Sequence, residues 1–166
     1  YDYFGDFTVA FEAFKAGELH FRNENNSKNW ATGYDIPAVK DGRMTLEMPA
    51  NGSVQGMQGF IFNTRKNKFK DLKLRQAFNH AYDFEWVNRV IYNNAYTRTN
   101  SYFENSPLAS SGVPSEAELE LLNPWKDQLP IEVFTKSYKS PISDGSGMPR
   151  ENLIIAKQIL EEEGWF

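Results

Sequence analysis

Cysteine is absent from this chain of 166 residues. Its absence excludes disulfides, zinc-finger and iron–sulfur sites, and thiol nucleophiles. The lack of free thiols fits an oxidising compartment, although many cytosolic proteins also lack cysteine. We therefore expect a fold without covalent cross-links and without a thiolate-bound cofactor.

Histidine is scarce as well, since His20 and His80 are the only two. Neither belongs to an HExxH motif, so both are interpreted as structural residues rather than metal ligands. No GxSxG elbow supports a Ser-His-Asp triad, although the parts of a triad need not be adjacent in sequence. The sequence therefore predicts that the protein binds no cofactor and no metal and has no enzymatic activity.

Excess positive charge and long apolar runs are missing too. The chain carries 18 basic and 22 acidic residues, which gives a net charge of −4. Nucleic acid requires a basic stripe, and the densest cationic run, residues 65–73, is interrupted by Asn67, Phe69 and Asp71. No stretch of 18 apolar residues is present. We therefore expect neither nucleic-acid binding nor a membrane-spanning segment.

The remaining composition is that of an ordinary folded protein. Hydrophobic residues make up 40% of the chain and charged residues 24%, which is enough apolar material for a core. The length suits one domain or two small halves. Because the chain starts at Tyr1 without an initiator methionine and stops just after Gly164, where a strand should follow, we expect an interior fragment of a longer protein.

Apolar spacing predicts helices along much of the chain. The first covers residues 7–16, where Phe7, Ala10, Phe11 and Phe14 recur at helical intervals. Caps and spacing together predict further helices over residues 29–34, 36–40, 72–82, 84–94, 116–122 and 149–163.

Alternation and continuous apolar runs predict strands between these helices. The clearest candidate is residues 57–63, which contain Phe60, Ile61 and Phe62 in succession. Shorter strands are predicted over residues 19–22 and 43–48, and another within 128–136. The order helix, strand, helix, strand, strand, followed mostly by helices, favours an α/β fold.

Two polar loops are candidates for ligand contacts. Residues 23–30 are rich in asparagine, whose amides can pair with a peptide backbone, and Trp30 adds a stacking surface; the alternative is an ordinary turn. Residues 99–105 hold Tyr102 and Phe103, either as anchors beneath the loop or as ligand contacts. A third loop, residues 144–147, lacks the trailing Lys-Ser/Thr of a phosphate-binding loop and is interpreted as flexible.

Three motifs, taken in order, resemble one known family. Residues 8–19 (TVAFEAFKAGEL) are a helix-Gly-strand unit. Residues 56–64 (GMQGFIFNT) and 69–83 (FKDLKLRQAFNHAYD) combine a strand ending in Asn with an Arg-Gln-Ala helix, and residues 153–165 (LIIAKQILEEEGW) form a later helix. Together they resemble the extracellular solute-binding proteins of family 5, the receptors of peptide and nickel ABC importers. Residues 27–35 and 96–106 resemble the branch of oligopeptide receptors that includes the microcin C receptor.

The resemblance implies a two-lobed periplasmic-binding-protein fold of type II, which closes on its ligand by a hinge motion. This chain would hold the end of lobe I in residues 1–57 and the start of lobe II in residues 58–166. Family positions that face the cleft fall in the asparagine loop, at the start of the crossing strand and in the later polar loop. With Trp30 as a stacking surface, the expected ligand-lining residues are Glu24, Asn25, Asn26, Trp30, Met57, Gln58, Tyr102 and Phe103.

The implied function is capture of an oligopeptide or peptide-conjugate ligand, without chemistry, for the membrane permease of an ABC importer. The expected location is the periplasm, or the outer face of a membrane through a preceding anchor. One alternative is a receptor for a nickel complex or an oligosaccharide, and the scarcity of His and Cys argues against nickel. Others are a carboxylate-dependent hydrolase using Glu24 and Glu104, which no motif supports, and a fragment that folds but does not bind.

Overall fold

The computed structural model describes residues 1–165, and helices are the only regular elements within that range. The longer helices are α1 (Phe7–Lys15), α4 (Leu72–Ala81), α5 (Phe84–Val90), α6 (Glu116–Leu122) and α8 (Arg150–Glu162). Single helical turns complete the set: η1 (Asn29–Gly33, π-helical), α2 (Pro37–Lys40), α3 (Asn67–Lys70), η2 (Asn123–Trp125, 3₁₀) and α7 (Glu132–Thr135).

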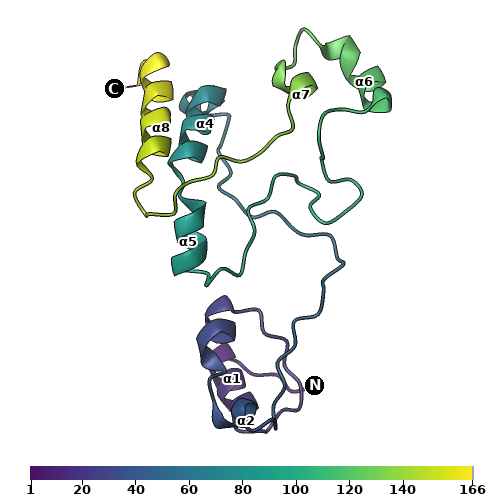
Figure 1. The fold of residues 1–166 in the computed structure, drawn as a ribbon, viewed down its shortest axis with the longest axis vertical. Helices are drawn as coiled ribbons and strands as arrows, with labels where there is room; N and C mark the ends of the chain where they lie inside the picture. The colour runs from purple at the N-terminus through teal and green to yellow at the C-terminus, as the bar shows by residue number, and fades with distance from the viewer. Residues whose placement is uncertain (166) are drawn as a thin grey trace.

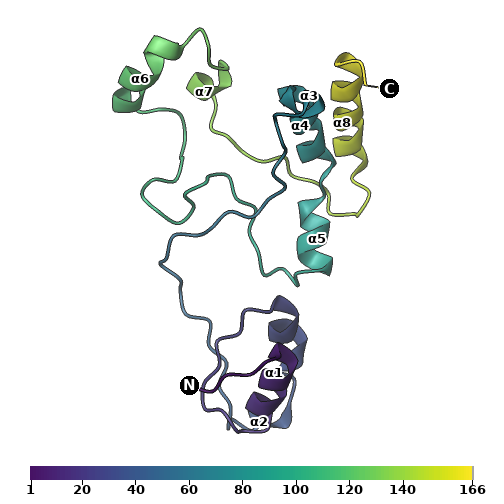
Figure 2. The same ribbon diagram turned by 180° about the vertical axis from the view of Figure 1, so that it is seen from behind.

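The first part of the chain folds around α1. Asp6 caps this helix, since its Oδ1 accepts hydrogen bonds from the backbone N–H groups of Thr8 and Val9 at 2.8 and 3.0 Å. Phe11 on α1 packs edge-on against Tyr34, with ring centroids 5.1 Å apart, and both side chains are buried. Figures 1 and 2 show α1 and α2 together at one end of the molecule, joined to the rest by an extended chain.

Helices α4 and α8 form a second packed group, and α5 follows α4 directly along the chain. In Figure 1, α4 and α8 lie side by side, and their contact buries Leu74, Ala77 and Ala156. These small and branched side chains allow the two helix backbones to approach closely. The side chain of Arg75 holds the corner between α3 and α4, because its Nη1 donates to the carbonyl of Phe69 at 2.6 Å.

Helices α6 and α7 lie apart from both groups in the two ribbon views. A capping box starts α6: Glu118 N–H donates to Ser115 Oγ at 3.4 Å, and Ser115 N–H donates to Glu118 Oε2 at 2.7 Å. No residue of α6 or α7 is buried.

Most helix predictions are confirmed, with small differences at the ends. The helix predicted over residues 84–94 stops at Val90, because Asn93 and Asn94 have φ angles of 54° and 59° that no helix accommodates. The predicted helix over 29–34 is a π-helical turn, Asn29–Gly33. The turn α3 was not predicted; its Phe69 packs against Phe62, with ring centroids 5.1 Å apart.

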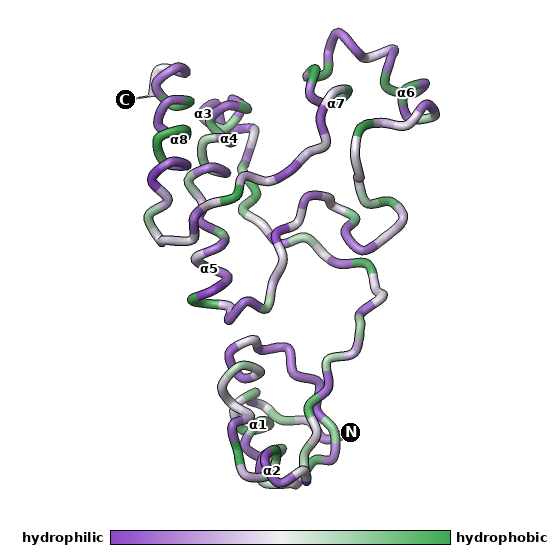
Figure 3. Tube along the Cα trace, viewed as in Figure 1, coloured by the Kyte–Doolittle hydropathy of each residue, from purple (hydrophilic) through white to green (hydrophobic). Residues whose placement is uncertain are grey.

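The strand predictions are not confirmed. Residues 19–22, 43–48 and 57–63 run without a ladder partner in the described chain, and the strand predicted within 128–136 is wrong because that segment contains α7. A strand is defined by hydrogen bonds to a neighbouring strand, and none of the described residues supplies one. Phe60 and Ile61 are accordingly 83% and 97% exposed, and Figure 3 shows apolar positions along this non-helical chain. The β half of the predicted α/β class is therefore not seen in residues 1–165.

Two predicted absences can be compared with the described residues. No helix in residues 1–165 is both long and apolar enough to cross a bilayer. The same residues bring together no cluster of three or more His, Cys, Asp or Glu side chains suited to a metal ion.

Candidate functional site

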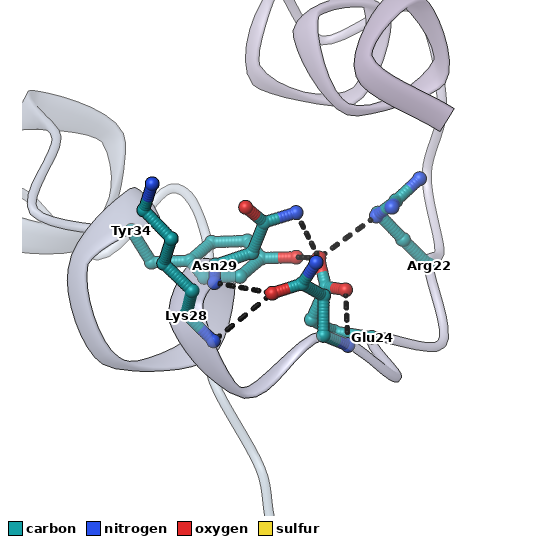
Figure 4. A network of polar contacts seen from close by, with 6 residues as sticks. Arg22, Glu24, Lys28, Asn29 and Tyr34 are labelled. Atoms are coloured by element: carbon teal, nitrogen blue, oxygen red, sulfur yellow. Dashed lines mark hydrogen bonds and ion pairs between the residues drawn. The ribbon is translucent and has the colours of Figure 1, made fainter. Parts of the chain in front are cut away.

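The loop of residues 22–34 is organised around the carboxylate of Glu24 (Figure 4). Its Oε2 accepts hydrogen bonds from Arg22 Nε at 3.2 Å, Tyr34 Oη at 3.0 Å and Asn29 Nδ2 at 3.4 Å. Its Oε1 accepts from the backbone N–H of Asn26 at 2.9 Å. Only 4% of the Glu24 side chain is exposed. The carboxylate thus fixes both ends of the loop and its middle.

Electrostatics keep this centre in one protonation state near neutral pH. Burial acts to raise the pKa of Glu24, but hydrogen bonds from Asn26, Tyr34 and Arg22 outweigh it, so the pKa lies below its usual value. Burial, together with the hydrogen bond to Glu24, raises the pKa of Tyr34 to about 12. The carboxylate is therefore charged and the phenol protonated, which is the pairing that the geometry requires.

The asparagines of this loop divide into a structural and an exposed part. Asn26 Oδ1 accepts from the backbone N–H groups of Lys28 and Asn29 at 3.0 and 3.1 Å, which fixes the turn that leads into η1. Asn25 and Asn26 are nevertheless exposed. Trp30 is half-buried and packs edge-on against Tyr34, with centroids 6.1 Å apart. The loop therefore offers amides to solvent from a backbone that is held in place.

A second loop, residues 100–105, is tied to the extended chain that follows the first part. Asn105 Nδ2 donates to the carbonyls of Asn51 and Ser53 at 2.8 and 2.7 Å. Gln55 N–H donates to the carbonyl of Glu104 at 3.0 Å. Asn105 adopts φ 58°, a left-handed conformation that asparagine tolerates better than most residues. These bonds join segments about fifty positions apart in sequence.

The structure gathers the eight predicted site residues into two groups. The first is the Glu24 loop, with Glu24, Asn25, Asn26 and Trp30. The second comprises Met57 and Gln58 on the extended chain and Tyr102 and Phe103 in the second loop, two segments that the Gln55–Glu104 hydrogen bond joins. Every member of the second group is exposed, with 76% of Tyr102 and 53% of Phe103 open to solvent.

Two depressions of the described surface lie away from both groups. One lies between α6 and α7 and includes Val113, Leu122 and Val133 in its lining. The other lies between α4 and α8 and includes Leu153, Leu160 and Trp165. Neither is lined by a predicted site residue.

Sequence reasoning did not single out Arg22, Asn29 or Tyr34. Arg22 fell within a predicted strand, and Tyr34 is ten positions from its partner Glu24. No periodicity links residues at such spacing. The only available signal was the nearness of Arg22 to Glu24, a pair of opposite charges two positions apart.

A further polar network lies at the start of α5 and has a structural role. Asp83, which is 8% exposed, accepts from the backbone N–H groups of Trp86 at 2.9 Å and Gly147 at 2.8 Å. The hydroxyl of Ser143 bonds to the carboxylates of Asp83 and Glu85, and no hydrogen bond joins it to a histidine within residues 1–165. Burial acts to raise the pKa of Asp83, but these hydrogen bonds hold it below its usual value. The arrangement is a clamp on α5 and not a nucleophile with its base.

The clamp corrects the interpretation of residues 144–147 as a flexible loop. Arg89 Nη2 donates to the carbonyl of Gly145, and Gly147 N–H is held by Asp83. Gly147 has φ 84°, and a Cβ at this position would lie 2.8 Å from Trp86 Nε1. The glycines permit close packing of the loop against α5 and leave no room for a phosphate there.

His80 lies in the last turn of α4, near the charge of Arg98. Its Nδ1 is buried without a hydrogen-bond partner in the described residues. Burial, and then the charge of Arg98, lowers the pKa of His80. Arg98 itself donates to Asn79 Oδ1 at 2.6 Å and to the carbonyl of Pro141 at 2.7 Å. A neutral histidine in packed surroundings agrees with the structural role predicted for it.

Comparison with known proteins gives a consistent result. The family described as bacterial extracellular solute-binding proteins, family 5 Middle, matches residues 1–165. The chain is 46% identical over 167 residues to a probable peptide-binding protein YejA of Agrobacterium fabrum, and 45% identical over 165 residues to the uncharacterized protein YejA of Escherichia coli K12. A peptidoglycan-binding protein YepA of Agrobacterium fabrum is 37% identical over 171 residues. The alignments cover 98–99% of this chain but only 27–28% of these relatives, so the chain spans about a quarter of their length.

Proposed function

We propose a peptide-binding role for this chain, which belongs to the bacterial extracellular solute-binding proteins of family 5. In this role it contributes part of the ligand cleft of the binding component of an ABC importer. The protein captures oligopeptides or peptide conjugates outside the cytoplasmic membrane and delivers them to the permease. It carries out no chemistry on them.

The family match over residues 1–165, together with 46% identity to a relative named as a probable peptide-binding protein, carries this proposal. The Glu24 loop supports it chemically. Asn25 and Asn26 expose amides from a loop whose backbone is already fixed. Fixed amides can pair with the N–H and C=O groups that all peptides share, at little cost in ordering.

Family membership implies the type II periplasmic-binding-protein fold. Within that fold we assign residues 1–57 to lobe I and residues 58–166 to lobe II. The extended residues 45–63 support this division, because they form no helix and connect the α1–α2 part to α4, α5 and α8 (Figure 1). The Glu24 loop then contributes the lobe I side of the cleft, and Tyr102 and Phe103 contribute the lobe II side.

The relative named as peptidoglycan-binding favours a second ligand within the same class. Peptidoglycan consists of peptides joined to sugars, so its fragments are peptide conjugates. A cleft that recognises peptide backbone through amides would accept such a fragment if the sugar extended into solvent. The proposal therefore includes both free and conjugated peptides.

Calorimetric titration of the full gene product with a pooled library of tri- to octapeptides tests the proposal. We expect saturable binding, weakened about 5- to 10-fold by Asn25→Ala and by Tyr102→Ala, because both side chains are exposed and available. Glu47→Ala, an exposed residue far from both groups in sequence, is the control and should leave binding unchanged.

Titration with purified peptidoglycan fragments is the companion measurement. Saturation by the fragments alone would restrict the ligand to conjugates. No binding of either probe would overturn the proposed function. Binding that none of the substitutions changes would remove both groups of residues from the site.

A further inference from the structure

Arg22 is held more firmly than a surface arginine. Only 13% of its side chain is exposed. Its Nε donates to Glu24 Oε2 at 3.2 Å, and its guanidinium carbon lies 5.4 Å from the centre of the Phe11 ring. A carboxylate therefore fixes one edge of the guanidinium and an aromatic ring covers one face. This fixes the orientation of a side chain that is otherwise among the most mobile.

The outer edge of the same guanidinium has no partner. Within residues 1–165, neither Nη1 nor Nη2 of Arg22 takes part in a hydrogen bond. Neither atom is buried. Among the described residues, the one buried side-chain nitrogen or oxygen that lacks a hydrogen-bond partner is Nδ1 of His80, not an atom of Arg22. The two Nη groups therefore reach solvent from a fixed position.

Three other arginines of the chain, Arg75, Arg89 and Arg98, use this edge to hold the fold. Nη1 of Arg75 donates to the carbonyls of Phe69, Lys70 and Asp71. Nη groups of Arg89 and Arg98 donate to carbonyls in the 141–145 segment. Arg22 differs from these three because only its Nε is used, which leaves the pair of Nη groups that suits a carboxylate in bidentate geometry.

The charge of Arg22 remains available to a ligand although Glu24 lies beside it. The Glu24 carboxylate also accepts from Asn26, Asn29 and Tyr34, so its negative charge is distributed over several donors. A guanidinium stays protonated in proteins, and it can bind one carboxylate through Nε and another through its outer edge.

We propose that Arg22 binds a carboxylate of the peptide ligand through Nη1 and Nη2. The inference rests on the proposed peptide-binding function and specifies where the anionic end of the ligand lies. Asn26, whose N–H shares the Glu24 carboxylate with Arg22, and its neighbour Asn25 then pair with the adjoining peptide backbone. The carboxylate is either the C-terminus of the peptide or an acidic side chain.

Four peptide pools titrated into the full gene product distinguish these cases. The pools are tri- to octapeptides with a free or an amidated C-terminus, each prepared with and without Asp and Glu. We expect the wild type to bind carboxylate-bearing pools about 10- to 100-fold more tightly than the amidated pool that lacks acidic residues, as a bidentate ion pair requires. Preference for the free C-terminus identifies the terminus as the source, and preference for acidic content identifies the side chain.

Arg22→Gln should abolish this preference and leave the affinity for the amidated neutral pool unchanged. Arg22→Lys keeps the positive charge but not the paired Nη groups, so it should retain part of the preference. A folded Arg22→Lys variant with this intermediate preference would show that the loss in Arg22→Gln is not caused by unfolding. Arg43→Gln is the matched control, because Arg43 is paired with Asp41 and its side chain is 71% exposed. A wild type that binds all pools equally, or an Arg22→Gln variant that keeps the preference, would overturn the inference alone. Absence of binding to every pool would overturn the proposed function and the inference with it.

Discussion

The two groups of predicted site residues are built in different ways. In the Glu24 loop, every hydrogen bond to the central carboxylate comes from a residue at most ten positions away. The Tyr102–Phe103 surface is held by Asn105, whose partners Asn51 and Ser53 are 54 and 52 positions distant. Hydrogen bonds within one loop therefore hold the first group, whereas hydrogen bonds between distant segments hold the second.

The same contrast appears in the aromatic residues. Tyr34 in the Glu24 loop is 5% exposed, and Trp30 packs against it. Tyr102 is 76% exposed, and Phe103 and Met57 are also open. Exposed aromatic and thioether side chains are free to be covered when a ligand or another part of a protein binds. The aromatic side chains of the first group are thus packed within the loop, whereas those of the second are open to solvent.

Removing the Glu24 carboxylate should have the largest effect on stability. Glu24→Ala leaves Arg22 and the hydroxyl of Tyr34 without their shared acceptor in a site that is largely buried. We expect a loss of about 2–4 kcal/mol of unfolding free energy in the full gene product, measured by chemical denaturation. Hydrogen exchange should speed up across residues 22–34.

Glu47→Ala is the control for this change, since Glu47 is exposed and makes no ion pair in the described chain. A Glu24→Ala variant as stable as Glu47→Ala would contradict the view of Glu24 as the centre of a preformed loop.

Breaking the long-range connection should have a smaller and more local effect. Asn105→Gly removes both side-chain hydrogen bonds but keeps the left-handed φ of 58° accessible. We expect a loss of about 1–2 kcal/mol, seen as faster exchange of the Gln55 amide. Asn105→Ala should cost about 1 kcal/mol more, because alanine adopts this conformation at a steric penalty.

Residues 22–34 should exchange at the wild-type rate in both Asn105 variants. Faster exchange there would mean that the two groups are coupled, contrary to the comparison above.

The smallest expected effect concerns the alkaline titration of Tyr34. Its folded pKa of about 12 lies above the value of 10.0 for a free tyrosine. A group whose pKa is raised by folding contributes stability below its unfolded pKa, and that contribution is lost as pH rises from about 10 toward 12. Burial also raises the pKa of Tyr82, so spectrophotometric titration of tyrosine ionisation should show late-titrating phenols, of which one disappears in Tyr34→Phe.

Tyr102→Phe is the control for that titration, because Tyr102 is exposed and lies outside the Glu24 loop. If Tyr34→Phe leaves the late step unchanged, the hydrogen bond between Tyr34 and Glu24 does not govern the tyrosine titration.

Helices and their caps were predictable because their determinants are local. Asp6, Asp71 and Asp83 each accept a hydrogen bond from a backbone N–H two or three residues later, and each starts a helix where the sequence indicates one. Residues 57–63 show the limit of such reasoning. Their apolar pattern is that of a strand, but the strand requires a partner that residues 1–165 do not contain.

The candidate site likewise has features set by local sequence and features set by the tertiary structure. The sequence by itself determined the asparagine loop and its turn, because amide and carboxylate side chains bond to backbone groups a few residues away. It also determined the family, through motifs spread over the whole chain. Only the tertiary structure decided that Glu24 faces inward, that Arg22 keeps its outer edge open, and that residues 100–105 lie against residues 51–55. These features depend on which side chains approach from elsewhere in the chain, and pairing of that kind leaves no periodic trace in a sequence.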